Sequence, residues 1–135
     1  MYMLDTDMCI YLINERDQAL RQKFEENASS VCVSSITYAE LCFGVAHSAR
    51  VEENQQELQA FCLDLDTLPF DTEAGVHYGR IRQELARRGQ TIGANDLLIA
   101  AHASSADATL VTNNEREFGR VPGLRVENWL AGLSR

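Results

Sequence analysis

The sequence predicts an α/β fold of three layers, in which helices cover both faces of a central parallel sheet of about five strands. Two kinds of segment lead to this prediction. Short apolar runs, typical of buried strands, alternate along the chain with longer segments of helical periodicity, and this alternation favours parallel strands joined by helices. The 135 residues also contain no proline- or glycine-rich linker, so we expect one domain that spans residues 1–135.

The first part of the chain provides two strands, each followed by a helix. Tyr2–Leu4 is a short apolar run and is predicted to form a strand, and Asp7–Ile13 continues as a helix. Asp17 is a favourable N-cap for a second helix that extends to about residue 26. Val31–Ser34 is short and rich in β-branched residues, which favours a second strand.

The middle of the chain is predicted to add two helices and a third strand. Thr37–His47 and the longer segment Val51–Phe61 have helical periodicity. Leu65–Leu68 is predicted to be a third strand. It ends at Pro69, because proline has no backbone N–H to continue the strand pairing.

The last part alternates in the same way. A helix begins near Asp71 and stops at Gly89, a residue type that commonly ends helices. Asp96–Ser105 is predicted to be a helix and Thr109–Val111 a strand, followed by a turn through residues 113–114. Residues 124–126 are predicted to form the last strand.

Composition limits the function. The net charge of −8 excludes nucleic-acid binding through overall charge attraction, but suits a basic partner or a metal site. The four cysteines have no zinc-ligand spacing, so we expect reduced thiols in the core. No segment has the length of a membrane span and the first residues lack the basic region of a signal peptide, so we expect a cytoplasmic protein without membrane contact.

Three acidic residues stand at the ends of predicted elements. Asp5 follows the first strand, Glu40 lies in the first turn of the helix after the second strand, and Asp96 opens a later helix. Because the carboxyl ends of parallel strands share one edge of a sheet, we expect these carboxylates to meet. Mg²⁺ and Mn²⁺ prefer such oxygen ligands, and a divalent ion there could activate water for phosphodiester hydrolysis.

Each of these acids also has an ordinary structural role open to it. Asp5 and Asp96 could serve only as helix N-caps. Glu40 could form a capping box with Thr37, which lies three residues earlier. For each residue alone the structural role is a reasonable explanation. If all three roles were only structural, however, three acidic residues would have to lie at sheet edges by coincidence.

Further polar residues could support the site. Thr112, Asn114 and Glu117 follow the strand Thr109–Val111, and sequence spacing does not rank Asn114 against Glu117; the segment could also be a plain polar loop. A basic cluster on or after the helix that ends at Gly89 could contact RNA phosphates, or could be a solvated face. These candidate substrate-binding arginines, with one from the later segment, are Arg80, Arg82, Arg87, Arg88 and Arg116.

Four motifs in order resemble a known family. They are residues 3–7 (MLDTD), 34–41 (SSITYAEL), 92–103 (IGANDLLIAAHA) and 111–118 (VTNNEREF). They resemble the PIN-domain ribonucleases and, more narrowly, the VapC toxins of bacterial toxin–antitoxin pairs. The resemblance covers almost the whole chain.

The resemblance implies an Mg²⁺- or Mn²⁺-dependent endoribonuclease. Asp5, Glu40 and Asp96 match three members of the family's acidic quartet, and all three are therefore candidate metal ligands and catalytic residues. Asn114 stands where many PIN domains have Asp, so Glu117 is expected to help there, with support from the hydroxyls of residues 6 and 112 (Thr6 and Thr112). Asp7 also departs from the family, in which Asn is common at that position.

The resemblance also implies partners. A VapC-type toxin of a type II system cleaves structured RNA such as tRNA, forms a homodimer and is inhibited by a small cognate VapB-like antitoxin. Two other functions remain open. A DxD-type phosphatase would account for residues 5–7, but it needs a downstream lysine and the only lysine is Lys23. A non-catalytic metal-binding α/β module would bind the ion without cleaving RNA.

Overall fold

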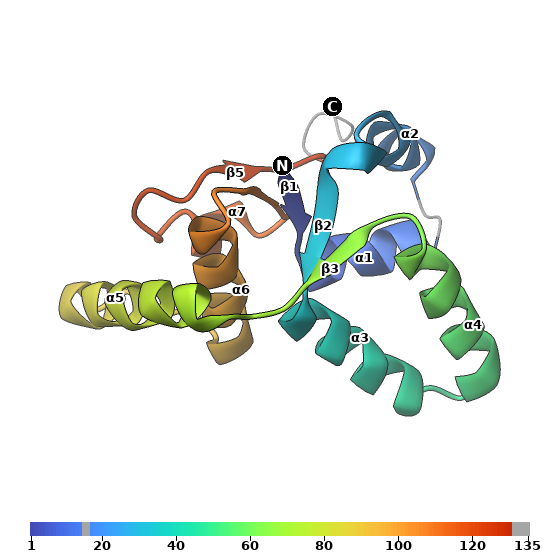
Figure 1. Ribbon diagram of the computed structural model, residues 1–135, viewed down its shortest axis with the longest axis horizontal. Coiled ribbons are helices and arrows are strands. Elements are labelled where there is room, and N and C mark those ends of the chain that lie inside the picture. Colours follow the sequence, from blue (N-terminus) through green and yellow to red (C-terminus); the bar gives the residue numbers. More distant parts are fainter. Residues whose placement is uncertain (15–16, 131–135) are drawn as a thin grey trace.

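The computed structural model describes residues 1–14 and 17–130, and has a five-stranded parallel sheet between two layers of helices (Figure 1). The strand order is β3-β2-β1-β4-β5. The strands are β1 (Tyr2–Leu4), β2 (Val31–Ser34), β3 (Asp66–Leu68), β4 (Thr109–Val111) and β5 (Val126–Glu127). The helices are α1 (Thr6–Ile13), α2 (Gln18–Glu26), α3 (Ser35–Ala46), α4 (Val51–Cys62), α5 (Thr72–Arg88), α6 (Ala94–Ser105) and α7 (Glu115–Phe118), with a 3₁₀ turn at Ala28–Ser30. The predicted fold class is confirmed.

Successive side chains of the buried strands point to alternate faces of the sheet, so each strand contributes to the core under both helical layers. In β1, Met3 packs with the apolar residues of α5 and α6, whereas Leu4 packs with those of α1 to α4. In β4, Leu110 and Val111 divide in the same way. Successive side chains of a strand point to opposite faces, so even a three-residue strand contributes to both cores. A parallel sheet that is covered by helices on both sides requires strands that are apolar on both faces.

Two helices begin earlier than the sequence predicts. Ser34 is the N-cap of α3, because its hydroxyl accepts a hydrogen bond of 3.1 Å from the amide of Ile36. Thr37 is therefore buried inside the helix, and the proposed capping box with Glu40 is wrong. Likewise Gly93 is the N-cap of α6, so Asp96 lies within the first turn and is not a cap.

The segment after β4 differs most from its prediction. The turn through residues 113–114 is followed by the short helix α7, whose Phe118 is fully buried against the core beside α5 and α6. Strand β5 pairs with β4 at residues 126–127 and not at 124–126. By contrast, α5 ends as predicted at Gly89, which adopts the left-handed conformation with φ of 67°.

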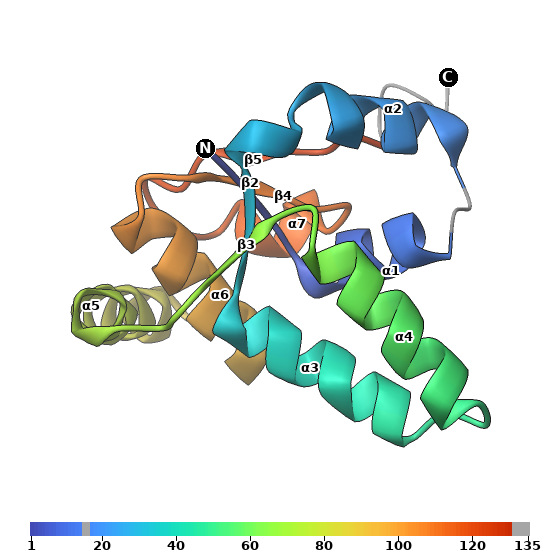
Figure 2. The same ribbon diagram turned by 45° about the vertical axis from the view of Figure 1, so that its right-hand side comes forward.

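The elements converge at one edge of the sheet. The strands are parallel, so β1, β2 and β4 all end at this edge. Figure 2 shows α3 starting where β2 ends, with α6 passing beside it, and these two helices are in contact. No helix in the described part of the chain is long and apolar enough to cross a membrane.

Candidate active site

Asp5 lies at the centre of this edge, immediately after β1. Its carboxylate has two structural partners: Oδ1 accepts a hydrogen bond of 2.9 Å from the amide of Met8 and caps α1, while Oδ2 accepts one of 2.5 Å from the hydroxyl of Thr112. Thr112 follows the neighbouring strand β4 and is itself fully buried. The N-cap role, which was the structural alternative for Asp5, is confirmed, and Thr112 contacts the same carboxylate directly.

The environment of Asp5 disfavours its charge. Burial raises the pKa of Asp5 from its usual 3.8 to about 6, although the hydrogen bonds from Thr112 and Met8 act in the opposite direction. The negative charges of Asp7 and Glu40 raise this pKa further. A pKa change of this size corresponds to about 3 kcal/mol of unfavourable free energy for the ionised side chain. A nearby cation would relieve this cost.

Glu40 is held at both carboxylate oxygens by side chains from two other helices. Oε1 accepts a hydrogen bond from the hydroxyl of Thr6 at the start of α1. Oε2 accepts one of 3.0 Å from the amide nitrogen of Asn95 at the start of α6. The hydroxyl oxygen of Thr37 lies 3.4 Å from that of Thr6 and completes the group. This arrangement fixes the direction in which Glu40 presents its carboxylate.

Asp96 faces Glu117, which reaches the site from α7. Glu117 accepts hydrogen bonds of 3.1 Å from the amide of Gly93 and 3.0 Å from the side chain of Asn114. Burial raises the pKa of Asp96 from its usual 3.8 to about 7, and the adjoining Glu117, Asp5 and Glu40 carboxylates raise it further. Burial acts to raise the pKa of Glu117 too, but the hydrogen bonds from Asp96, Gly93 and Asn114 outweigh it, so this pKa lies below its ordinary value.

The structure therefore brings most of the sequence-predicted site together. The charges of Asp5, Glu40 and Asp96 affect one another, and Thr6, Thr112, Asn114 and Glu117 all contact one of these acids or its partner. The sequence did not single out Asn95. Its position next to Asp96 was a signal, but an amide in the first turn of a helix is so common that it carried no weight.

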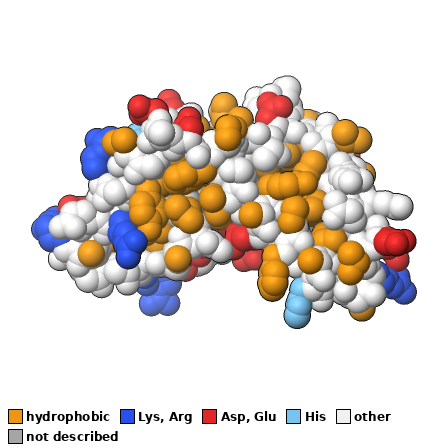
Figure 3. Space-filling model, turned by 60° about the horizontal axis from the view of Figure 1, so that its bottom comes forward, with side chains coloured by type: hydrophobic (Ala, Val, Ile, Leu, Met, Phe, Trp, Pro, Cys, Tyr) orange, Lys and Arg blue, Asp and Glu red, His pale blue; other side chains and the backbone are white. Residues whose placement is uncertain are grey.

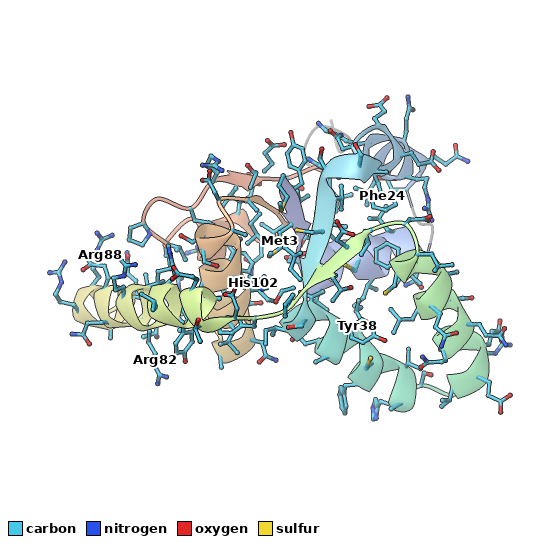
Figure 4. The ribbon with its side chains drawn as sticks, in the orientation of Figure 1. Met3, Phe24, Tyr38, Arg82, Arg88 and His102 are labelled. Atoms are coloured by element: carbon cyan, nitrogen blue, oxygen red, sulfur yellow. The ribbon has the colours of Figure 1, made fainter. Side chains whose placement is uncertain are left out.

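In the described part of the chain, no predicted arginine forms an ion pair with the acids of this cluster. Figure 3 shows basic side chains on the α5 side of a face whose middle carries acidic ones. Figure 4 shows Arg88 at the far end of α5, away from the sheet, while Arg82 points to the lower side, where α6 begins. Arg87 and Arg88 both bind Glu84, with nitrogen–oxygen distances of 2.5 and 2.6 Å. Their role in substrate binding stays a prediction, as do those of Arg80 and Arg116.

The donor set fits an open divalent metal site. No group of three histidine, cysteine or acidic side chains in residues 1–14 and 17–130 is arranged to enclose an ion. Mg²⁺, however, is usually bound through one or two carboxylates and keeps several waters, so it does not need such a cage. Asp5 and Asp96 supply hard oxygen donors in a crowded acidic environment that disfavours their negative charge. The residues present therefore fit Mg²⁺ or Mn²⁺.

Comparison with known proteins assigns the family. The family model of the PIN domain matches residues 2–124. The tRNA(fMet)-specific endonuclease VapC of Salmonella typhimurium is 44% identical over 128 residues, which cover 95% of this chain and 97% of that protein. Ribonuclease VapC2 of Rickettsia felis is 45% identical over 130 residues, with 95% and 97% covered. The chain belongs to the PIN-domain family, in its VapC group.

Solved structures of VapC-group proteins share this fold. DNA-bound VapBC from Salmonella typhimurium matches with a TM-score of 0.92 and 44% identity, over 95% of this chain and 97% of that one. VapBC2 from Rickettsia felis, bound to a DNA fragment of its promoter, matches with a TM-score of 0.91 and 44% identity, over 95% and 98%. The resemblance inferred from the four motifs of this VapC-group protein is confirmed.

The phosphatase alternative finds no support in the site of this VapC-group protein. Lys23 lies on α2, and its ammonium nitrogen is 5.9 Å from the centre of the Trp129 ring. Figure 1 places α2 at the opposite end of the sheet from the starts of α3 and α6. The lysine that a DxD-type phosphatase would need is therefore not at the acidic cluster.

Proposed function

We propose that this protein is a divalent-metal-dependent endoribonuclease and the toxin of a type II toxin–antitoxin system, cleaving structured RNA such as tRNA. The observation that carries the proposal is the gathering of Asp5, Glu40, Asp96 and Glu117 at the carboxyl edge of the sheet in a chain of the VapC group. The relative from Salmonella typhimurium is named as an endonuclease specific for tRNA(fMet). Since tRNA is the proposed substrate, the expected location is the cytoplasm.

Asp5 and Asp96 are the proposed metal ligands. Both are carboxylates whose surroundings raise their pKa, so a bound cation would favour their ionised form. When bound, Mg²⁺ or Mn²⁺ would lower the pKa of a coordinated water and neutralise charge on the phosphate. Glu40 would orient the attacking water, and its hydrogen bonds from Thr6 and Asn95 support this role.

Glu117 is the proposed fourth acid, in place of the Asp found at the position of Asn114 in many PIN domains. The Asn114 amide donates to Glu117, so the two residues act together: Asn114 directs the carboxylate and Glu117 supplies the charge. The main-chain amide of Asn114 donates in turn to Thr112, which contacts Asp5. Through this sequence of hydrogen bonds the segment after β4 aligns both ends of the acidic cluster.

An apolar hollow beside the site suits an antitoxin. A cavity of about 240 Å³ lies between α1, α3 and α4, and Glu40 forms part of its rim. Its walls include Ile10, Ile13, Leu41 and Leu58. A VapB-like antitoxin would bury apolar side chains there, and basic residues near its end would meet the acidic cluster of a chain with net charge −8. The structures of similar proteins are VapBC complexes, and we propose the same kind of partner and a homodimer here.

RNA cleavage tests the proposal directly. Purified antitoxin-free protein is incubated with total tRNA in Mg²⁺, in Mn²⁺ and in EDTA, together with Asp96→Asn and the exposed control Asp64→Asn. We expect discrete fragments that require metal, disappear with Asp96→Asn and persist with Asp64→Asn. Metal binding by calorimetry without any RNA cleavage would instead favour the non-catalytic module. Cleavage that survives Asp96→Asn would refute the assigned site.

A further inference from the structure

A second cavity lies next to the acidic cluster, between α5 and the start of α6. Its volume is about 170 Å³. Its lining includes Tyr78 and Arg82 of α5, Thr91 and Ile92 of the connecting loop, and Ala94 of α6. Gly93, between two of these lining residues, donates its amide to Glu117 of the acidic cluster. The cavity and the candidate active site are thus adjacent along one short segment of chain.

The cavity has the size and lining for one aromatic ring. An apolar cavity of about 150 Å³ holds a benzene molecule. Here the floor is apolar, with Leu85 and Leu97, and the Tyr78 ring is half-buried in the wall. Proteins recognise RNA bases by stacking them on aromatic side chains or on the guanidinium plane of arginine. Both kinds of group are present.

Arg82 differs from the two arginines at the C-terminal end of α5. Arg87 and Arg88 are held by Glu84, whereas Arg82 forms no ion pair within the described part of the chain. Its guanidinium donates a hydrogen bond of 2.8 Å to the Tyr78 hydroxyl, and its central carbon lies 5.9 Å from the centre of the Tyr78 ring. Arg82 therefore has an uncompensated charge at the rim of a ring-sized cavity, in a chain whose overall charge repels RNA.

We propose that this cavity is a subsite for one unpaired pyrimidine base of the RNA, adjacent to the phosphate that the acidic cluster attacks. The single ring would enter against Leu85 and Leu97, with Tyr78 along one side and the Arg82 guanidinium over its edge. The cavity holds one ring, so a purine would fit less well. This inference rests on the proposed ribonuclease function.

The experiment combines protein variants with single abasic substitutions in the RNA. Once the wild type has given a cut site, short RNA substrates with an abasic nucleotide at each position flanking the cut are compared under steady-state conditions. At one flanking position the abasic nucleotide should raise KM by about fivefold or more. Arg82→Ala should raise KM similarly on the intact RNA, but add little on that abasic RNA, since both changes remove the same contact. Arg50→Ala removes one exposed arginine elsewhere and is the control for charge.

Two further variants distinguish a base subsite from a general effect of positive charge. Arg82→Lys keeps the charge without the planar fork and should not restore KM. Thr91→Phe fills the cavity from its rim and should reproduce the loss with Arg82 in place.

Equal losses from Arg82→Ala and Arg50→Ala, or independent effects of Arg82→Ala and every abasic position, would overturn the subsite while leaving the ribonuclease intact. A wild type that cuts no RNA would defeat the proposed function itself. Dissociation of a dimer by Thr91→Phe would show that a second copy fills the cavity, and would also overturn the proposal.

Discussion

Replacing Asp5 by asparagine should stabilise the metal-free protein, and should do so more at pH 8 than at pH 5. Asp5 has only 4% of its surface exposed. Burial raises its pKa from 3.8 to about 6, with Thr112 and the Met8 amide opposing that change. Each difference of one in pKa between the folded and unfolded states corresponds to about 1.4 kcal/mol, so ionised Asp5 costs the folded protein about 3 kcal/mol.

The direction in which the free energy of unfolding changes with pH follows from the number of protons that the folded and unfolded states bind. Between pH 3.8 and about 6 the folded protein holds more protons at Asp5 than the unfolded chain, so the free energy of unfolding falls as the pH rises through this window. The stability is fully present below the unfolded pKa and is lost above the folded one. Burial lowers the pKa of His102, which acts in the opposite direction because stability is then lost as the pH falls. Comparing the wild type with Asp5→Asn cancels this contribution, since His102 is present in both.

Urea unfolding in EDTA at pH 5 and pH 8 measures the effect. A pKa of about 6 implies a loss of about 1.6 kcal/mol by pH 5 and about 3 kcal/mol by pH 8, so the advantage of Asp5→Asn should grow by about 1.4 kcal/mol between the two. A constant offset is expected from the altered hydrogen bonds to Thr112 and Met8, and it does not change with pH. The exposed control Asp64→Asn should show no such growth. An advantage of Asp5→Asn that is equal at both pH values would refute the reasoning.

Three further predictions test the metal, the positioning of Glu40 and the packing of α7. Mg²⁺ or Mn²⁺ at about 100 times its Kd should raise the free energy of unfolding of the wild type by about 2.7 kcal/mol, measured by urea unfolding, and that of Asp96→Asn by much less; equal gains would contradict the assigned ligand. Asn95→Ala removes one donor to Glu40 and should lower kcat for RNA cleavage about tenfold without changing Tm, because Asn95 is exposed; an unchanged kcat would show that Asn95 does not position Glu40. Phe118→Ala should cost about 3–5 kcal/mol in urea unfolding, and a loss below 1 kcal/mol (roughly a single weak contact) would mean that α7 is not anchored by this ring.

The sequence predicted the first four strands well because their signal is local. A three-residue apolar run such as Tyr2–Leu4 must be buried on both faces, and this requirement leaves few alternatives to a central parallel strand. The starts of α3 and α6 were predicted two residues late for a different reason. Thr37 and Asp96 are favourable capping residues, so the sequence placed the helix starts there. In the structure each helix begins as soon as the chain leaves the preceding strand or loop, with Ser34 as the N-cap of α3 and Gly93 as the N-cap of α6.

The part of the site that depends on tertiary contacts could not be ranked from the sequence. Whether Asn114 or Glu117 supplies the fourth acid depends on α7, a helix of four residues that is too short to be stable alone. Burial of Phe118 anchors it, and this turns Glu117 towards Gly93 and Asp96. The burial of Phe118 is a tertiary contact that sequence spacing does not reveal, so the sequence left both Asn114 and Glu117 as candidates.

The two roles considered for Asp5, helix cap and metal ligand, turn out to be compatible. A carboxylate has about four lone-pair positions, two on each oxygen. The Met8 amide uses one on Oδ1 and the Thr112 hydroxyl uses one on Oδ2, so each oxygen keeps a position for a cation. These two hydrogen bonds also fix the side-chain torsions before any ion arrives, which reduces the entropy lost on binding. Capping α1 is therefore part of how Asp5 could serve as a ligand, and a residue at the junction of a strand and a helix can satisfy both requirements.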